Sequence, residues 1–219
     1  MKTAIKVKGR VPPHIELELL TESFEEQLSS GDVRDAIASK TTLPSLLSPR
    51  GQPVRVERCV WRNVTLSDPN VQQLRLRDSL IENCDLANID LTGGLLERVD
   101  ITSSRLTGAA FTEVQLKSVL FRECKLDFAV MRMAKLENCI FENCNLTDAD
   151  FYHADLSGNV FRGCDLSRAD IPHAKLTGAD IRDCRLDGMR GMPANMDGLI
   201  ISSDQAALLI TLFGVRVAW

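Results

Sequence analysis

Seven cysteines and three histidines are the residues of this sequence best suited to metal binding, redox chemistry or acid–base catalysis. The cysteine-x-x-cysteine spacing of zinc sites is absent. The positions of five cysteines differ by multiples of twenty, and a small, readily buried side chain at so regular an interval indicates packing. We therefore expect free thiols, with no metal and no cofactor, in the column formed by Cys84, Cys124, Cys144, Cys164 and Cys184.

Two of the histidines, His153 and His173, are separated by the same interval and are expected side by side on an outer face. Without a convergent carboxylate or thiol, two exposed imidazoles favour a solvent-facing role over a metal or proton site. The nucleophile elbow, the glycine-rich phosphate loop and the His-Glu-x-x-His motif are all missing from the sequence. The sequence therefore predicts a protein that is not an enzyme.

The element that must position these residues is a repeat with a period of five. From residue 56 to residue 186 every fifth residue is large and apolar, which makes 27 consecutive pentapeptides without a slip in the frame. The residue two places earlier is usually Ala or Cys. A period of five fits neither a helix nor a strand, so each pentapeptide must be a short segment ending in a corner, with one large and one small residue directed inward.

Units such as Ala149-Asp150-Phe151 and Cys164-Asp165-Leu166 resemble the pentapeptide repeat family, in which a small residue, then Asp or Asn, then Leu or Phe precede two polar residues. The resemblance implies an all-β solenoid: a right-handed quadrilateral parallel β-helix with four pentapeptides in each coil. At a strand spacing of about 4.8 Å, nearly seven coils give a rod on the order of 30 Å long. We expect a small N-terminal cap, extension and linker over residues 1–53, the β-helix over 54–190, and a C-terminal capping segment over 191–219.

Residues 1–53 are expected to cover the open end of the β-helix, whose unpaired backbone is otherwise an aggregation template. Residues 5–8 and 15–19 alternate like short strands. Ser23 with Glu26, and the segment 31–40, indicate one or two short helices.

Two positions inside the repeat depart from its pattern. Pro69 replaces a small inward residue, and a loop of two extra pentapeptides beside it would leave the frame unchanged. Asn159 places a polar side chain in the small inward column, so it needs an internal hydrogen-bond partner.

The C-terminal segment contains a short helix that is apolar on most sides. Ser203 and Asp204 are suitable N-cap residues, and Gly214 ends the pattern. The helix carries more apolar residues than one face can bury against the last coil, so it is either a cap or a cap that also dimerises. It resembles the C-terminal module through which Qnr-type and mycobacterial fluoroquinolone-resistance members of the family pair end to end. The resemblance implies a homodimer through Leu208, Leu209, Leu212 and Phe213.

Charge is unevenly distributed over the expected faces. The chain has 26 Lys and Arg against 30 Asp and Glu, a net charge of −4, which excludes a nucleic-acid binder that relies on a large basic excess. No membrane span or signal peptide is evident, so a cytoplasmic protein is expected. One face has a net charge of −5, because only Arg168 and Arg190 oppose its seven aspartates: Asp68, Asp90, Asp127, Asp148, Asp150, Asp170 and Asp187.

The resemblance implies a partner for this acidic face. Resistance-type members of the family bind type II DNA topoisomerase in place of duplex DNA and protect it from inhibitors, so DNA gyrase or topoisomerase IV is the implied partner. Duplex DNA carries a charge per roughly 1.7 Å, so a rod of this length would need on the order of 18 negative charges for a full match. A general protein-interaction scaffold or regulator with no topoisomerase role is the alternative.

Overall fold

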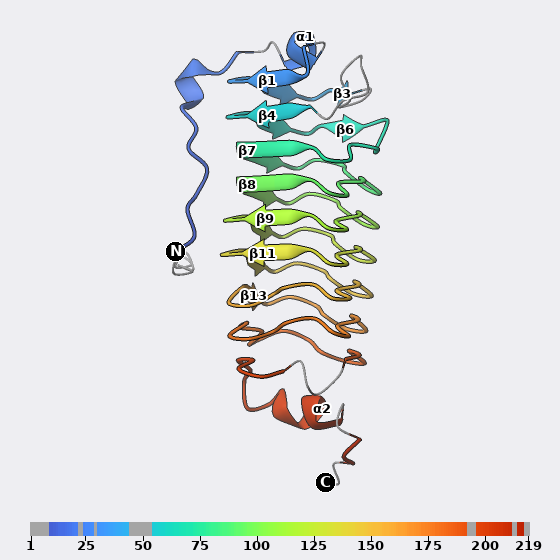
Figure 1. Cartoon of the computed structure of the whole chain (residues 1–219). Helices are drawn as coiled ribbons and strands as arrows, with labels where there is room; N and C mark the ends of the chain where they lie inside the picture. The colour runs from blue at the N-terminus through green and yellow to red at the C-terminus, as the bar shows by residue number, and fades with distance from the viewer. Residues whose placement is uncertain are drawn as a thin grey trace.

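The computed structural model describes residues 9–21, 24–28, 30–43, 54–191, 196–211 and 214–216. These residues form a right-handed, four-sided parallel β-helix, which confirms the fold that the period of five and the family resemblance predict. The coils stack into a rod with a short helix at either end (Figure 1).

Successive coils pair in parallel, and each residue lies opposite the one four pentapeptides later: Leu76 opposite Leu96, and Ile81 opposite Ile101. The strands lie on two adjacent faces for most of the rod, while the remaining faces are joined by single bridges such as Asp150 to Asp170. From residue 54 onward the strands are β4 (Arg55–Glu57), β5 (Val60–Arg62), β6 (Thr65–Leu66), β7 (Arg75–Glu82), β8 (Leu95–Thr102), β9 (Gln115–Lys117), β10 (Leu120–Arg122), β11 (Lys135–Glu137), β12 (Ile140–Glu142) and β13 (Val160–Arg162).

The β-helix begins one coil earlier than the predicted boundary at residue 54. β1 (Asp32–Arg34), β2 (Ile37–Ser39) and β3 (Thr42–Leu43) pair in parallel with β4, β5 and β6. The helix predicted over residues 31–40 is therefore wrong. Val33, Ala38 and Leu43 follow the period of five, but Val33 lies opposite Val56, an offset longer than four pentapeptides that breaks the frame.

Helix α1 (Phe24–Leu28) covers this first coil, as the predicted cap requires. Phe24 is buried and meets Trp61 edge-to-face, with ring centroids 5.5 Å apart. Residues 15–19 were expected as a strand, but the chain forms a 3-10 turn, η1 (Leu17–Leu19), at this place. The strand expected over residues 5–8 lies outside the described residues.

An extended N-terminal segment, residues 9–16, lies along the outside of the rod (Figure 1). We call it the N-terminal strap. Val11 N donates to Ser118 Oγ at 3.2 Å, and His14 N donates to Asp78 Oδ1 at 3.0 Å. Side chains of the coils therefore hold the strap, which the sequence pattern did not predict.

Large apolar residues fill the interior as the period predicts. All frame residues from 56 to 186 are buried except Leu66, which is half-buried. Phe141 stacks on Phe121 at 4.8 Å and on Phe161 at 4.6 Å between ring centroids. No extra loop lies beside Pro69, because Asn70 pairs with Asp90 in the ordinary register of four pentapeptides.

Asn159 has the internal partners that its buried position requires. Its amide nitrogen donates to Leu136 O at 3.0 Å and to Ser157 O at 3.2 Å, and its Oδ1 accepts from Cys139 N at 2.7 Å. The side chain thus satisfies a main-chain donor of the preceding coil.

The β-helix also continues beyond the predicted boundary at residue 190. Ile200 N donates to Ala179 O at 2.8 Å, and Ile181 N donates to Ile200 O at 3.0 Å. The frame continues here through Met196 and Ile201, with Gly191 at a position where a Cβ would lie 2.5 Å from the Ile171 side chain.

Helix α2 (Ala206–Ile210) closes this end of the rod. Its N-cap is Gln205 and not the predicted Ser203 or Asp204. The buried Gln205 amide donates to Ile181 O at 2.9 Å and to Cys184 O at 2.8 Å, which fixes the helix to the last coils. No helix among the described residues has the length and apolar character needed to cross a membrane.

Candidate functional site

Between residues 54 and 191, three large apolar side chains are exposed, and they lie on neighbouring corners. The exposed fractions are 58% for Phe128, 44% for Met133 and 37% for Tyr152. Phe128 and Met133 belong to one coil, and Met133 N donates to Tyr152 O of the next coil at 2.9 Å. We call the surface formed by residues 128–133, 148–153 and 168–173 the Phe128 face.

Phe128 occupies a corner where the backbone is left-handed, with φ of 59°. The same corner holds Asn88 and Gly108 in the two preceding coils, and Asp148 and Arg168 in the two following coils. Positive φ suits Gly and Asn and costs other residues about 1 kcal/mol. A phenyl ring that is also exposed gains little burial in return for this cost.

Tyr152 is held in place by its neighbours. Its ring meets His153 edge-on at 4.4 Å and His173 at 5.6 Å, and the guanidinium carbon of Arg132 lies 5.8 Å from its centroid. The two imidazoles stack at 4.7 Å, which confirms that His153 and His173 lie side by side. An aromatic side chain that is already oriented loses less conformational entropy when it binds a partner.

The seven aspartates of the predicted acidic face do not form one continuous acidic surface. Asp90, Asp150 and Asp170 share a column, in which Ala110 and Val130 separate Asp90 from the other two. The remaining four aspartates, Asp68, Asp127, Asp148 and Asp187, lie at or beside the adjacent corner.

Four of these aspartates are ion-paired with arginines of the same chain. The hydrogen bond from Arg168 holds the pKa of Asp148 below its usual range. The pairs, with their N···O distances, are Asp148 with Arg168 at 2.7 Å, Asp150 with Arg132 at 2.5 Å, Asp170 with Arg190 at 3.4 Å and Asp187 with Arg185 at 3.5 Å. The excess negative charge on this side of the rod is therefore smaller than a count by face predicts, because Arg132 and Arg185 belong to adjacent pentapeptides.

The other three aspartates accept hydrogen bonds from uncharged groups. Gln72 Nε2 donates to Asp90 at 2.6 Å and Thr107 Oγ1 to Asp127 at 2.9 Å. Asp68 accepts from the main-chain nitrogen of Asn70 at 3.0 Å. None of these three carboxylates has an arginine partner among the described residues.

The predicted dimerisation residues have different surroundings. Leu208 is 45% exposed, whereas Leu209 is only 6% exposed and belongs to the core of its own chain. Leu209 thus packs in the core of its own chain and holds the cap in place. Leu212 and Phe213 lie outside the described residues.

All seven cysteines are buried free thiols, which confirms their packing role. Cys144 Sγ, for example, donates to Phe121 O of the preceding coil at 3.4 Å. Burial raises the pKa of Cys59 to about 11 and that of Cys139 to about 12. Within the part of the chain that the structure describes, no three His, Cys, Asp or Glu residues are placed to hold a metal ion.

Comparisons with known proteins agree with this architecture. The family model of the pentapeptide repeat region matches residues 54–130 and 134–203. Trypsin-treated QnrB1, a plasmid-mediated fluoroquinolone resistance protein, is 17% identical, with a TM-score of 0.47 over 85% of this chain and 90% of that chain. No curated protein matches the sequence.

Two further solved structures of pentapeptide repeat proteins are similar at comparable identity. HetL, involved in heterocyst differentiation regulation in the cyanobacterium Nostoc sp. strain PCC 7120, is 19% identical with a TM-score of 0.43, over 77% of this chain and 86% of that chain. A protein of the Arabidopsis thaliana thylakoid lumen is 18% identical with a TM-score of 0.28, over 67% of this chain and 78% of that chain.

Proposed function

This chain belongs to the pentapeptide repeat family, and on that basis we propose that it is a non-enzymatic rod that docks another protein on the Phe128 face. The observation that carries the proposal is the exposure of Phe128, Met133 and Tyr152 on neighbouring coils. All other large apolar side chains between residues 54 and 191, a segment described throughout, are buried or half-buried. Aromatic and methionine side chains are enriched in protein interfaces, and a few such anchors supply most of the binding energy.

The charges around these anchors suit a polar rim. Arg132 and Asp150 border Tyr152, while Asp148 and Arg168 occupy the corner of Phe128 in the next two coils. Exposed ion pairs contribute about 0–1 kcal/mol each, so they can exchange partners with a docking protein at little cost. An apolar centre with exchangeable charges around it is the usual anatomy of a protein interface.

A type II DNA topoisomerase, DNA gyrase or topoisomerase IV, is the specific partner that we propose to test first. Asp68, Asp90 and Asp127 support it, because none of these carboxylates is paired with an arginine among the described residues. The four ion-paired aspartates weaken the support. A scaffold or regulatory role uses the same face and differs only in the partner.

Gyrase supercoiling with and without a fluoroquinolone tests this partner. If gyrase binds the Phe128 face, the protein shifts the drug-inhibition curve and its Phe128→Asp variant does not. Lys117→Asp is the matched control, since Lys117 is an exposed residue on another face of the rod. Unchanged curves with the unaltered protein would reject gyrase and leave docking of an unrelated partner.

A further inference from the structure

Arginines on the surface of the coils are paired with carboxylates, with a single local exception. Between residues 54 and 191, all of which are described, twelve of the fourteen arginines have a carboxylate oxygen within 4.0 Å. The two that have none among the described residues are Arg55 of β4 and Arg75 of β7, which are neighbours in the parallel register.

The two unpaired arginines project from the same side of the sheet. Val56 and Leu76, the next residues of their strands, are buried in the core, so Arg55 and Arg75 are directed outward, and both are exposed. Adjacent strands lie about 4.8 Å apart. Like charges directly opposite one another destabilise a sheet, and no carboxylate oxygen in the described part of the chain lies within 4.0 Å of either guanidinium group.

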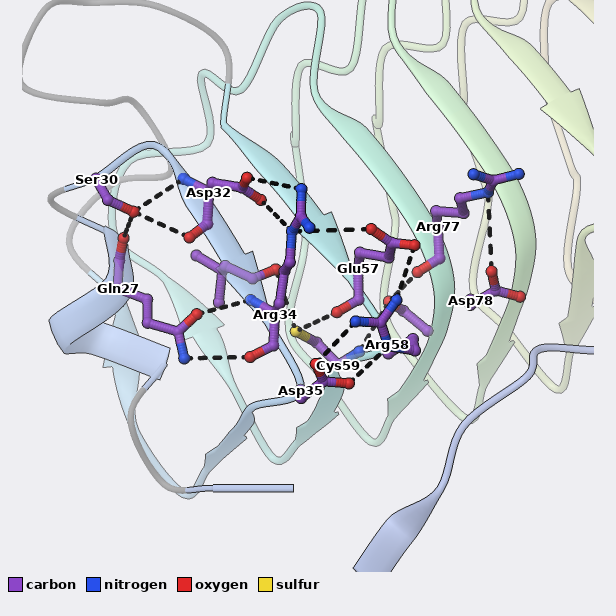
Figure 2. Close-up of polar contacts among 12 residues, drawn as sticks. Gln27, Ser30, Asp32, Arg34, Asp35, Glu57, Arg58, Cys59, Arg77 and Asp78 are labelled. Carbon is purple, nitrogen blue, oxygen red and sulfur yellow. Dashed lines mark hydrogen bonds and ion pairs between the residues drawn. The ribbon is translucent and has the colours of Figure 1, made fainter. Parts of the chain in front are cut away.

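Carboxylates close to the pair are engaged elsewhere (Figure 2). Asp32 is the register neighbour of Arg55 on its other side, yet it accepts hydrogen bonds from Arg34 at 2.9 and 3.0 Å. Each nearby carboxylate has an arginine of its own: Asp32 pairs with Arg34 and Glu57 with Arg58, as Figure 2 shows, and Glu97 pairs with Arg77. Arg55 and Arg75 thus keep guanidinium donors that can bind a ligand.

A hollow lies beside these guanidinium groups, lined by Gln73, Gly93, Gly94, Leu95 and Gln115 in addition to the two arginines. Gly93 and Gly94 have no side chains to fill the space. Gln73 and Gln115 carry amide groups that can donate hydrogen bonds. Leu95, the register neighbour of Arg75, contributes an apolar floor in place of a third charge.

From this geometry we infer an oxyanion-binding site for a phosphate group. Arg55 and Arg75 supply two planar forks that can each donate two hydrogen bonds to phosphate oxygens. The bound anion replaces the missing carboxylate and removes the repulsion between the two cations. This site goes beyond protein docking on the Phe128 face, because none of the residues that line the hollow belongs to residues 128–133, 148–153 or 168–173.

Isothermal titration of the full-length protein with inorganic phosphate, and separately with glycerol phosphate as a phosphomonoester, tests the site. We expect saturable binding that Arg55→Gln and Arg75→Gln each weaken at least tenfold. Arg185→Gln is the matched control, because Arg185 is also exposed but is ion-paired with Asp165 at 3.1 Å. Equal affinity for the two probes identifies free phosphate as a sufficient ligand, whereas tighter binding of the ester identifies a phosphorylated small molecule.

Thermal unfolding gives a second readout that a merely structural role would not produce. Arg75→Gln should raise the Tm in phosphate-free buffer, because it removes a like-charge repulsion. Added phosphate should raise the Tm of the unaltered protein but not that of the Arg75→Gln variant. Absence of saturable binding, or equal weakening by Arg185→Gln, would overturn the proposal.

Discussion

Arg10 of the N-terminal strap and Asp100 of the rod form an ion pair that joins residues 90 positions apart in the sequence. Asp100 stands in an outward column whose neighbours in register, Leu80 and Leu120, are apolar. Burial raises the pKa of Asp100, although Arg10 opposes the shift. A charge in an apolar column is thus matched by a charge on the segment that covers it.

Removing one partner of this pair should destabilise the protein. Arg10→Ala leaves the Asp100 carboxylate unpaired and half-buried, and the free energy of unfolding should fall by about 2 kcal/mol. The double variant Arg10→Met with Asp100→Leu extends the apolar column and should recover at least the original stability, because apolar residues often replace a buried ion pair without loss. Urea denaturation measures both. A double variant no more stable than Arg10→Ala would contradict the prediction.

Stability should fall in acid because of Asp78. Burial alone would raise the pKa of this carboxyl, but hydrogen bonds from Arg98 at 2.6 and 2.7 Å and from His14 N outweigh burial and hold the pKa below its usual value. The stability that Asp78 provides is therefore present above its unfolded pKa, and is lost as pH falls through the lower folded pKa.

Urea denaturation between pH 7 and pH 3 checks this sign. Asp78→Asn should be less stable than the unaltered protein at pH 7 and should lose less stability on acidification. The contribution of Asp100 to stability changes with pH in the opposite direction, because burial raises the pKa of Asp100 in the folded protein. The stability of Asp100→Asn relative to the unaltered protein should therefore increase as pH rises.

Much of the fold could be predicted because one physical constraint repeats. A large inward residue at every fifth position determines the coil, the stacking of His153 on His173, and the need of Asn159 for internal partners. The first coil was missed since its longer register moves Val33 out of the frame of Val56. Residues 31–40 therefore look unrelated to the repeat, although their inward residues Val33 and Ala38 are also five positions apart.

The candidate site was only partly predictable for a different reason. A count of charges by pentapeptide assigns each residue to one face. It does not show that a long side chain can reach across a corner to a residue on the next face, so the pairing of Arg132 with Asp150 was missed. The N-terminal strap has no periodic signal at all. Phe128 could have been recognised, because it stands at a corner that Gly or polar residues hold in other coils, namely Asn88, Gly108, Asp148 and Arg168.

Substitutions of Asn159 should separate hydrogen bonding from packing. Asn159→Ala introduces the usual small residue but leaves Cys139 N without its acceptor, so the free energy of unfolding should fall by about 2–3 kcal/mol. Asn159→Ser should cost less, because Ser104 Oγ serves the same purpose for Cys84 N at 3.1 Å. Chemical denaturation measures the free energy of unfolding of both variants and shows which is the less stable. If alanine is as well tolerated as serine, the internal hydrogen bond contributes nothing to stability.

End-to-end pairing through the C-terminal helix remains a proposal, and Leu208 is the residue that tests it. Leu208→Asp should give monomers without loss of stability, because this side chain is exposed in the single chain. Leu209→Asp should instead destabilise the cap, since Leu209 is buried. Light scattering at micromolar concentration distinguishes the states. If the unaltered protein is already monomeric there, the helix is a cap alone.

The central claim is that Phe128 serves binding at some cost to the fold. Phe128→Asn places a residue suited to positive φ at this corner, so the free energy of unfolding should stay unchanged or rise by about 1 kcal/mol. The same substitution removes an apolar anchor and should abolish docking. Gain of stability with loss of binding separates a functional side chain from a structural one.

Site-specific photo-crosslinking in the native host measures this most directly, with p-benzoylphenylalanine in place of Tyr152 and, as control, in place of Lys117. We predict a discrete protein adduct from position 152 and none from position 117, and we predict that Phe128→Asn eliminates the adduct while the purified variant unfolds at the same or a higher temperature. An adduct that persists in the Phe128→Asn protein, or that forms equally from position 117, would contradict docking on the Phe128 face.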